Sequence, residues 1–368
     1  MAAGEGALYS IGRWIVLFAI QPVHEDIRLV YVAAEAGLRY GWSRIYDIAT
    51  LQALSAQFPA GQNTITSSST YVHPPLWAWL FVPLTWFPEP VAYASWTLLS
   101  LIALMVAWHL TAPYRGLAKI TLVLAALALW PVMDAFYRGQ PSICILALVA
   151  VAWKLCRDNR PLAAGVALAV ATALKPQAVV LVPIALVVSG RYRPAIAWAA
   201  GSALLAGAAV ISLGPAGLTS WWHALNFVQT DTTPWSYSTL AYLFGLGPLT
   251  YALLAVQGLA ALAIAWRQRA NIEVVFAVGL LGSVAFSFHL HVYDYSLLVL
   301  SAWLVLRTSP PLWHRLWLLA GVFTMQALPL GIPVPQLIWD AGWLVILGTG
   351  VPSGKPLVNP SAQAAGLR

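Results

Sequence analysis

The amino-acid sequence predicts an all-α membrane protein, a polytopic bundle of about 12 transmembrane helices with short helices lying along its outer face. Hydrophobic residues make up 60% of the 368 residues, charged residues only 8%, and the mean hydropathy is +0.76. Soluble domains carry about 25% charged residues. This composition therefore excludes a water-soluble protein, and we expect lipid to surround most of the chain.

Apolar runs bounded by charged residues, Pro or Gly mark the expected spans. Several are shorter than the roughly 20 residues that an isolated helix needs to cross a bilayer, which a bundle tolerates where its helices line a cavity. We expect one domain over 1–351 and a disordered cytoplasmic tail over 352–368, which is rich in Pro, Gly, Ala and Ser. The expected spans are 11–22, 91–111, 117–132, 141–157, 161–174, 177–190, 194–213, 248–266, 272–288, 294–307, 313–328 and 336–350.

The distribution of Lys and Arg predicts the orientation of the chain. If the apolar stretches 75–87 and 238–246 lie along the outer face instead of crossing, every basic cluster falls on one side. Basic loops face the cytoplasm, so we expect both termini there, in a bacterial inner (plasma) membrane. The net charge of +7 then reflects this bias and not a nucleic-acid partner. The outer face is left with two long loops, 23–74 and 214–237, and long ordered loops commonly carry function.

Asp26 comes directly after the first expected span, in the sequence His24-Glu25-Asp26. The small residues Ala33-Ala34 and Ala36-Gly37 favour a short helix that packs closely, with Asp26 near its N-terminus, where a carboxylate gains about 0.3–1 kcal/mol. Two interpretations stay open. Asp26 is either a helix cap that faces water or a general base held at the membrane surface.

Lys175 interrupts an apolar stretch, 163–188, that contains no other charged residue. A lysine at the centre of a span costs about 2.5–3.5 kcal/mol. Pro176 turns the chain here, so two short helices can form a hairpin. The ammonium either snorkels to the surface or faces a cavity, where it can hold an anion.

The tetrapeptide Arg138-Gly139-Gln140-Pro141 joins two apolar segments. As a plain turn it has no functional meaning. Alternatively, Gly139 lets the backbone approach closely, Arg138 binds phosphate oxygens in a forked geometry, and Gln140 positions a substrate group.

A third polar motif runs from His289 to Asp294 and includes His291. Two histidines at this spacing lack nearby third and fourth ligands, so we expect no metal. The motif either caps a loop or bonds hydroxyls or phosphate of a ligand, with Asp294 positioning the groups. His73, before two prolines, is a candidate for the same cavity.

If these residues converge on one cavity in the outer leaflet, they suit displacement of a phosphate by an acceptor hydroxyl. Asp26 would take the hydroxyl proton, while the cations stabilise the departing phosphate. A sugar donor on a polyprenyl tail would explain why this chemistry lies in a membrane. The sequence contains no nucleotide-binding fingerprint or phosphate-binding glycine loop, and we expect no cofactor.

The ordered set of motifs resembles glycosyltransferase family 87, within the GT-C superfamily of multi-spanning enzymes. The resemblance covers roughly residues 26–300, and no single motif is specific. The motifs are Asp26-Ile27 with Val30-Tyr31 and Ala33-Ala34, Gly41, Tyr46-Asp47, Tyr71-Val72-His73-Pro74-Pro75-Leu76, Pro83-Leu84, Gly139-Gln140, Gly165 through Leu174-Lys175-Pro176, and His289 to Asp294.

The resemblance implies a mannosyltransferase similar to the actinobacterial enzymes that use polyprenyl-phosphate mannose. Asp26 then matches the catalytic carboxylate of the first outer loop, and a glycan or glycolipid is the acceptor. His73 stands where Tyr or another residue often occurs in the family. The first alternative is a transporter or flippase of lipid-linked sugars, which predicts inverted repeats that we do not detect. The second is a non-catalytic scaffold, which does not need Lys175. The third is an enzyme that transfers the sugar to protein or lipid A instead of a glycan.

Overall fold

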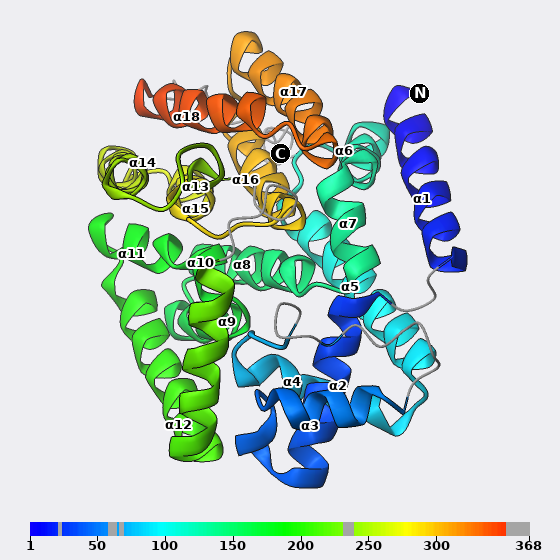
Figure 1. Ribbon diagram of the computed structural model, residues 1–368. Helices are drawn as coiled ribbons and strands as arrows, with labels where there is room; N and C mark the ends of the chain where they lie inside the picture. Colours follow the sequence, from blue (N-terminus) through cyan, green and yellow to red (C-terminus); the bar gives the residue numbers. More distant parts are fainter. Residues whose placement is uncertain (21–23, 58–64, 66–69, 231–238, 351–368) are drawn as a thin grey trace, which may run out of the picture.

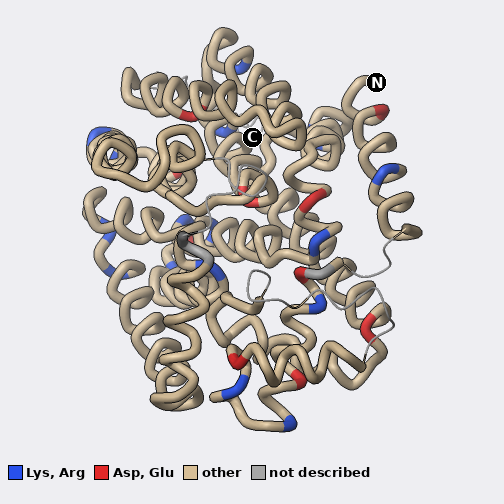
Figure 2. The backbone as a smooth tube through the Cα atoms, in the orientation of Figure 1, with Lys and Arg blue, Asp and Glu red and all other residues tan. Residues whose placement is uncertain are grey.

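The computed structural model describes residues 1–20, 24–57, 65, 70–230 and 239–350, and in these ranges it is helical without any β-strand. This confirms the all-α prediction. The predicted tail, 352–368, and residues 231–237 of the predicted second outer loop lie outside the described residues. Figure 1 shows the helices in their colours along the chain, and Figure 2 shows how sparsely charged residues occur along them.

The helices follow the apolar runs of the sequence. In chain order they are α1 (Ala2–Ile20), α2 (Glu25–Tyr40), η1 (Trp42–Arg44), α3 (Ile48–Ser55), α4 (Pro75–Phe81), η2 (Val82–Trp86), α5 (Glu89–Thr111), α6 (Gly116–Ala128), α7 (Trp130–Arg138), α8 (Ser142–Arg157), α9 (Pro161–Leu174), α10 (Pro176–Val179), α11 (Leu181–Val188), α12 (Tyr192–Thr230), α13 (Leu240–Phe244), α14 (Pro248–Arg267), α15 (Ile272–Phe286), η3 (Val292–Ser296), α16 (Leu297–Arg307), α17 (Leu312–Ala327), η4 (Leu328–Leu330) and α18 (Val334–Gly348).

Three segments in the described part of the chain are long and apolar enough to cross a membrane, namely α5, residues 192–227 of α12, and α14. A fourth exists if α6 and α7, bent by 62° at their junction, form one span. The predicted number of about 12 spans is therefore not confirmed. The physical reason is length, because runs such as α9 and α15 are helices of 14 and 15 residues, shorter than an isolated crossing requires.

The prediction of a second long outer loop over 214–237 is wrong as far as Thr230, because α12 continues through these residues. Within α12 the helical conformation is interrupted at Gly214, which has φ of 59° and ψ of −177°. Pro215 then begins a new helical stretch. A proline is well suited to the first turn of a helix, where its missing N–H costs nothing. Beyond the break, Trp221 donates a hydrogen bond to the carbonyl of Val72 at 3.0 Å, which ties this helix to the segment that precedes α4.

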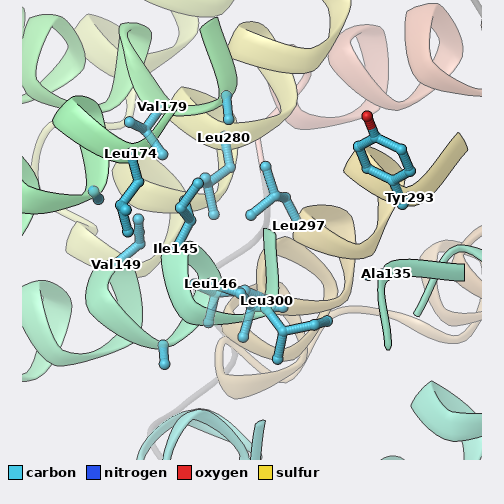
Figure 3. Packing of buried hydrophobic residues seen from close by; sticks show 14 of the residues in the cluster. Ala135, Ile145, Leu146, Val149, Leu174, Val179, Leu280, Tyr293, Leu297 and Leu300 are labelled. Atoms are coloured by element: carbon cyan, nitrogen blue, oxygen red, sulfur yellow. The ribbon is translucent and has the colours of Figure 1, made fainter. Parts of the chain in front are cut away.

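The apolar core is centred on α8. Ile145 and Val149 of α8 lie against Leu174 of α9 and Leu280 of α15, all buried (Figure 3). Close packing of small residues joins α9 to α12, where a Cβ on Gly165 would collide with the backbone of α12, as is common between membrane helices. The core therefore fixes the ends of α8 and α9, which carry predicted site residues.

The N-terminal helices α2, α3 and α4 lie at one end of the molecule, and α17 and α18 lie at the opposite end (Figure 1). The helix predicted over 75–87 is present as α4 and η2. A buried, bidentate ion pair fastens α2 to the start of α5, with Arg28 Nε 2.6 Å and Nη2 2.9 Å from the two Glu89 oxygens. The Tyr31 hydroxyl also donates to the carbonyl of Phe87 at 2.9 Å. These contacts determine where the N-terminus of α2 points.

Candidate active site

Asp26 lies in the first turn of α2, in agreement with the expected short helix. His24 caps this helix, because its Nδ1 accepts a hydrogen bond from the backbone N–H of Asp26 at 3.1 Å. The amide Nε2 of Gln140 donates to Asp26 Oδ2 at 2.9 Å. The other carboxylate oxygen, Oδ1, lies 3.7 Å from His24 Nδ1. One oxygen of Asp26 is thus fixed, and its side chain stays 19% exposed.

Gly139 explains how Gln140 reaches Asp26. It ends α7 in the left-handed region, with φ of 67°, a conformation that glycine adopts without strain. A Cβ at this position would lie 2.5 Å from Cδ1 of Ile27, the residue after Asp26. The glycine therefore allows the α7–α8 turn to approach the start of α2.

Arg138 lies between two carboxylates. Its Nε donates to Asp134 Oδ1 at 3.0 Å, one helical turn earlier, and its Nη1 is 3.7 Å from Asp26 Oδ2. The guanidinium carbon is 5.9 Å from the centre of the Tyr293 ring. Its side chain remains 35% exposed, so a charged substrate group can still reach it.

Lys175 forms a buried ion pair with Asp294. Its Nζ lies 2.6 and 2.7 Å from the two carboxylate oxygens, and neither side chain is more than 2% exposed. Asp294 also accepts hydrogen bonds from Ser142 Oγ at 2.9 Å and from the backbone N–H of His291 at 3.2 Å. The ammonium of Lys175 is therefore neutralised by a partner 119 positions away.

Tyr293 lies between Arg138 and the ion pair of Lys175 with Asp294. Lys175 Nζ lies 4.6 Å from the centre of its ring, and Arg138 lies against the same ring. His291 stacks on Tyr293, with ring centroids 5.0 Å apart, and His289 lies edge-on to His291 at 5.2 Å. One aromatic ring thus brings the late motif into contact with both predicted cations.

His73 completes the cluster. Its ring lies 4.4 Å from that of Trp77, in an edge-on arrangement, and the imidazole interacts electrostatically with Lys175, Asp26 and His289. The structure therefore brings all eight predicted site residues into one region. They are Asp26, His73, Arg138, Gln140, Lys175, His289, His291 and Asp294.

Three histidines of this cluster, His24, His73 and His291, are neutral at neutral pH. Burial lowers the pKa of His24 to about 4 and that of His73 to about 3. Burial, assisted by His289 and the nearby cations, also places the pKa of His291 well below its usual value. We therefore treat these imidazoles as hydrogen-bonding groups, and not as fixed positive charges.

Asp26 is ionised at neutral pH. Burial raises the pKa of this carboxyl group, but His24, Arg138 and the hydrogen bond from Gln140 outweigh burial and lower the pKa overall. Of the three carboxylates in the cluster, Asp134 is 6% exposed and Asp294 is fully buried, whereas Asp26 is 19% exposed. Asp26 is thus the carboxylate that a substrate can reach.

Sequence reasoning missed His24, Asp134, Ser142 and Tyr293 as members of this region. The i, i+4 spacing of Asp134 and Arg138 in a helix was a usable signal. Ser142 and Tyr293 gave no such signal, since their partners are distant in sequence. The described residues contain no group of three or more His, Cys, Asp or Glu side chains placed to hold a metal ion.

Comparison with known proteins supplies the family. The sequence model described as glycosyltransferase family 87 matches residues 71–290, more than half of the chain. No curated protein and no solved structure matches. The matched segment contains His73, Arg138, Gln140 and Lys175, whereas Asp26 precedes it and Asp294 follows it. The chain therefore belongs to glycosyltransferase family 87 and is a membrane glycosyltransferase.

Proposed function

We propose that this protein transfers a hexose, with mannose as our choice, from a polyprenyl-phosphate sugar to a hydroxyl group of a glycan or glycolipid. The reaction takes place at the outer face of a bacterial inner membrane and inverts the anomeric configuration. The observation that carries the proposal is Asp26, an ionised and accessible carboxylate beside an accessible arginine. Family membership supports the transferase class, and the bias of Lys and Arg supports the orientation.

In the proposed reaction, Asp26 Oδ1 accepts the proton of the acceptor hydroxyl, since Oδ2 is held by Gln140. The hydroxyl oxygen attacks the anomeric carbon, and the bond from that carbon to the phosphate oxygen breaks. The phosphate leaves with the electron pair, so its charge changes from about −1 to −2. A single displacement of this kind inverts the anomeric centre. The carboxylate of Asp26 becomes a neutral acid.

Arg138 is our first choice to bind the departing phosphate. In the resting site its charge is shared between Asp134 and Asp26. When Asp26 takes the proton, it loses its negative charge at the moment when the phosphate gains one. The guanidinium can therefore turn from Asp26 toward the phosphate and still face a negative charge. Hydrogen bonds that strengthen as charge develops on the leaving group are the ones that accelerate a reaction.

The sequence suggests that Lys175 binds the phosphate directly, but in this proposal it has a structural role. Its ammonium is occupied by Asp294, and Asp294 accepts from the backbone N–H of His291. The ion pair therefore holds the loop that presents His289 and His291. These imidazoles, with His73, donate hydrogen bonds to the phosphate or to sugar hydroxyls. Gln140 keeps the carboxylate of Asp26 in place.

The test is the variant Asp26→Asn, assayed with radiolabelled polyprenyl-phosphate mannose and with products identified by mass. The amide is isosteric, and Arg138 keeps Asp134 as its closer partner, so we expect a folded protein. Loss of a general base costs about 10²- to 10⁴-fold in rate. The matched control is Glu35→Gln, a carboxylate on the same helix that pairs with Arg39. Retention of most activity by Asp26→Asn, or an equal loss in Glu35→Gln, would refute the assignment.

A further inference from the structure

A second group of charged residues lies a helix length away from Asp26. Helix α8 begins at Ser142, which contacts Asp294, and ends at Arg157. Its 16 residues span about 24 Å at 1.5 Å per residue. Arg157 and Arg307 both lie against the Trp153 ring, with guanidinium carbons 5.2 and 4.9 Å from its centre. Two cations thus converge on one indole far from the candidate active site.

These two arginines share one carboxylate with a third. Arg157 Nη1 is 3.5 Å from Glu273 Oε1, and Glu273 also interacts electrostatically with Arg191 and with Arg307. Lys119 adds a further positive charge close to Arg307. We name Lys119, Arg157, Arg191 and Arg307 the basic cluster. Among the described residues, Glu273 is the carboxylate that the three arginines share, and Asp158 nearby pairs with Lys154, so the four cations carry a surplus of positive charge.

The orientation of the protein accounts for the sign of these charges, but not for the burial of some of their N–H groups. A cytoplasmic surface requires Lys and Arg in its loops, but exposed loop charges normally keep water as their partner. In the described residues, Arg191 Nη1 and Arg307 Nε are buried and make no hydrogen bond to another protein atom, although Arg307 Nη1 donates to the carbonyl of Thr111 at 3.2 Å. A buried donor without an acceptor costs about 1–3 kcal/mol. These two N–H groups are therefore donors that a ligand oxygen can satisfy.

An apolar groove begins beside the basic cluster. It has a volume of about 420 Å³, within the range of ligand clefts, and it runs along the exposed face of α5, one of the candidate spans. His109 connects the two features, since it lines the groove and its carbonyl accepts a hydrogen bond from Lys119 Nζ at 2.9 Å. The residues lining the groove are Leu101, Ile102, Met105, Val106, His109 and Leu110.

We propose that the basic cluster binds the phosphate of an anionic phospholipid, with one acyl chain lying in the groove along α5. Charge complementarity selects an anion, and guanidinium groups match the oxygens of a phosphate diester. The adjoining apolar groove on a spanning helix selects a lipid over a soluble anion. This site is separate from the proposed transfer reaction, because none of its residues belongs to the candidate active site.

The test measures lipid binding to the purified full-length protein by native mass spectrometry, with phosphatidylglycerol and phosphatidylcholine as probes. Each Lys or Arg near an anionic headgroup contributes about a fivefold preference, so Arg191→Gln/Arg307→Gln should weaken phosphatidylglycerol binding about thirtyfold. Arg157 is the more exposed arginine of the cluster, and Arg157→Gln should weaken phosphatidylglycerol binding about fivefold. This single variant still tests the proposal if the double variant fails to fold. Arg267→Gln, an exposed arginine outside the cluster, is the matched control and should change nothing.

Two further measurements separate the lipid from other anions. Ile102→Trp fills the groove and should weaken phosphatidylglycerol binding while leaving the basic cluster intact. Inorganic phosphate should compete only poorly, because it lacks an acyl chain. Equal binding of the neutral lipid, unchanged binding in the arginine variants, or competition by inorganic phosphate at the affinity of the lipid would overturn the proposal.

Discussion

Breaking the buried pair of Lys175 and Asp294 should destabilise the protein far more than removing both charges. The single variant Lys175→Met leaves a carboxylate with no exposure and no cation. Removing one partner of a buried ion pair costs about 3–5 kcal/mol. Asp294 keeps the hydrogen bonds from Ser142 and from the His291 backbone, so we expect the lower end, about 3 kcal/mol.

The double variant Lys175→Met/Asp294→Asn removes both charges and keeps an acceptor oxygen for Ser142. Replacing a buried pair with uncharged groups is often close to neutral, so we expect it to recover about 2 kcal/mol of the loss. Unfolding in mixed micelles by added dodecyl sulfate, followed by tryptophan fluorescence, measures the difference. Equal stability of the single and double variants, or no loss in Lys175→Met, would refute this account of the pair.

The same double variant separates two roles for Lys175 in donor use. If the ammonium binds the donor phosphate directly, the double variant stays as defective in KM for the donor as Lys175→Met. If Lys175 acts by holding the loop of His291, recovery of stability brings recovery of donor use. We expect the second result, since the lysine is buried and its three donors face Asp294 and the Tyr293 ring.

Three other changes test the surroundings of Asp26. In Gln140→Leu the carboxyl of Asp26 loses a hydrogen bond that lowers its pKa, so the acid limb of the kcat/KM profile should move to higher pH; an unmoved limb contradicts this role. Glu89→Gln leaves the buried Arg28 without its counter-charge and should cost about 3 kcal/mol or more in unfolding free energy, which Glu35→Gln should not. His24 has a pKa of about 4 when folded and 6.5 otherwise. The free energy of unfolding should therefore decrease as the pH is lowered from about 6.5 to about 4, by up to about 3 kcal/mol. His24→Gln should reduce this pH dependence when unfolding is measured across the same range.

The helical fold was predictable because hydropathy reports directly on burial in lipid or in an apolar core. The number of spans was not, because a run of about 15 apolar residues describes a buried helix as well as a short crossing. Taken alone, Gly214-Pro215 predicts the start of a loop. In the structure it is a break within α12, and the contact from Trp221 to Val72 holds the second half of that helix in place. No local pattern contains that contact.

The sequence identified the unusual side chains of the site, but not their partners. Lys175 was detectable because it stands alone in an apolar stretch, and Asp294 because it ends a polar motif. Their pairing joins residues 119 positions apart, and the contact of Gln140 with Asp26 joins residues 114 apart. A single sequence gives the cost of a buried charge, but the fold decides which opposite charge compensates it.

Exposure separates the charged residues near α2 into two kinds. The pairs Arg28–Glu89 and Lys175–Asp294 are closed to solvent, and each has both charges satisfied within the pair. Such pairs hold helices in register but cannot take part in a reaction without first breaking. Arg138 and Asp26 differ, because their nearest atoms are 3.7 Å apart and both side chains remain partly open. That loose contact can be exchanged for a substrate at little cost, which is the electrostatic condition for a base and a phosphate ligand that act in the same step.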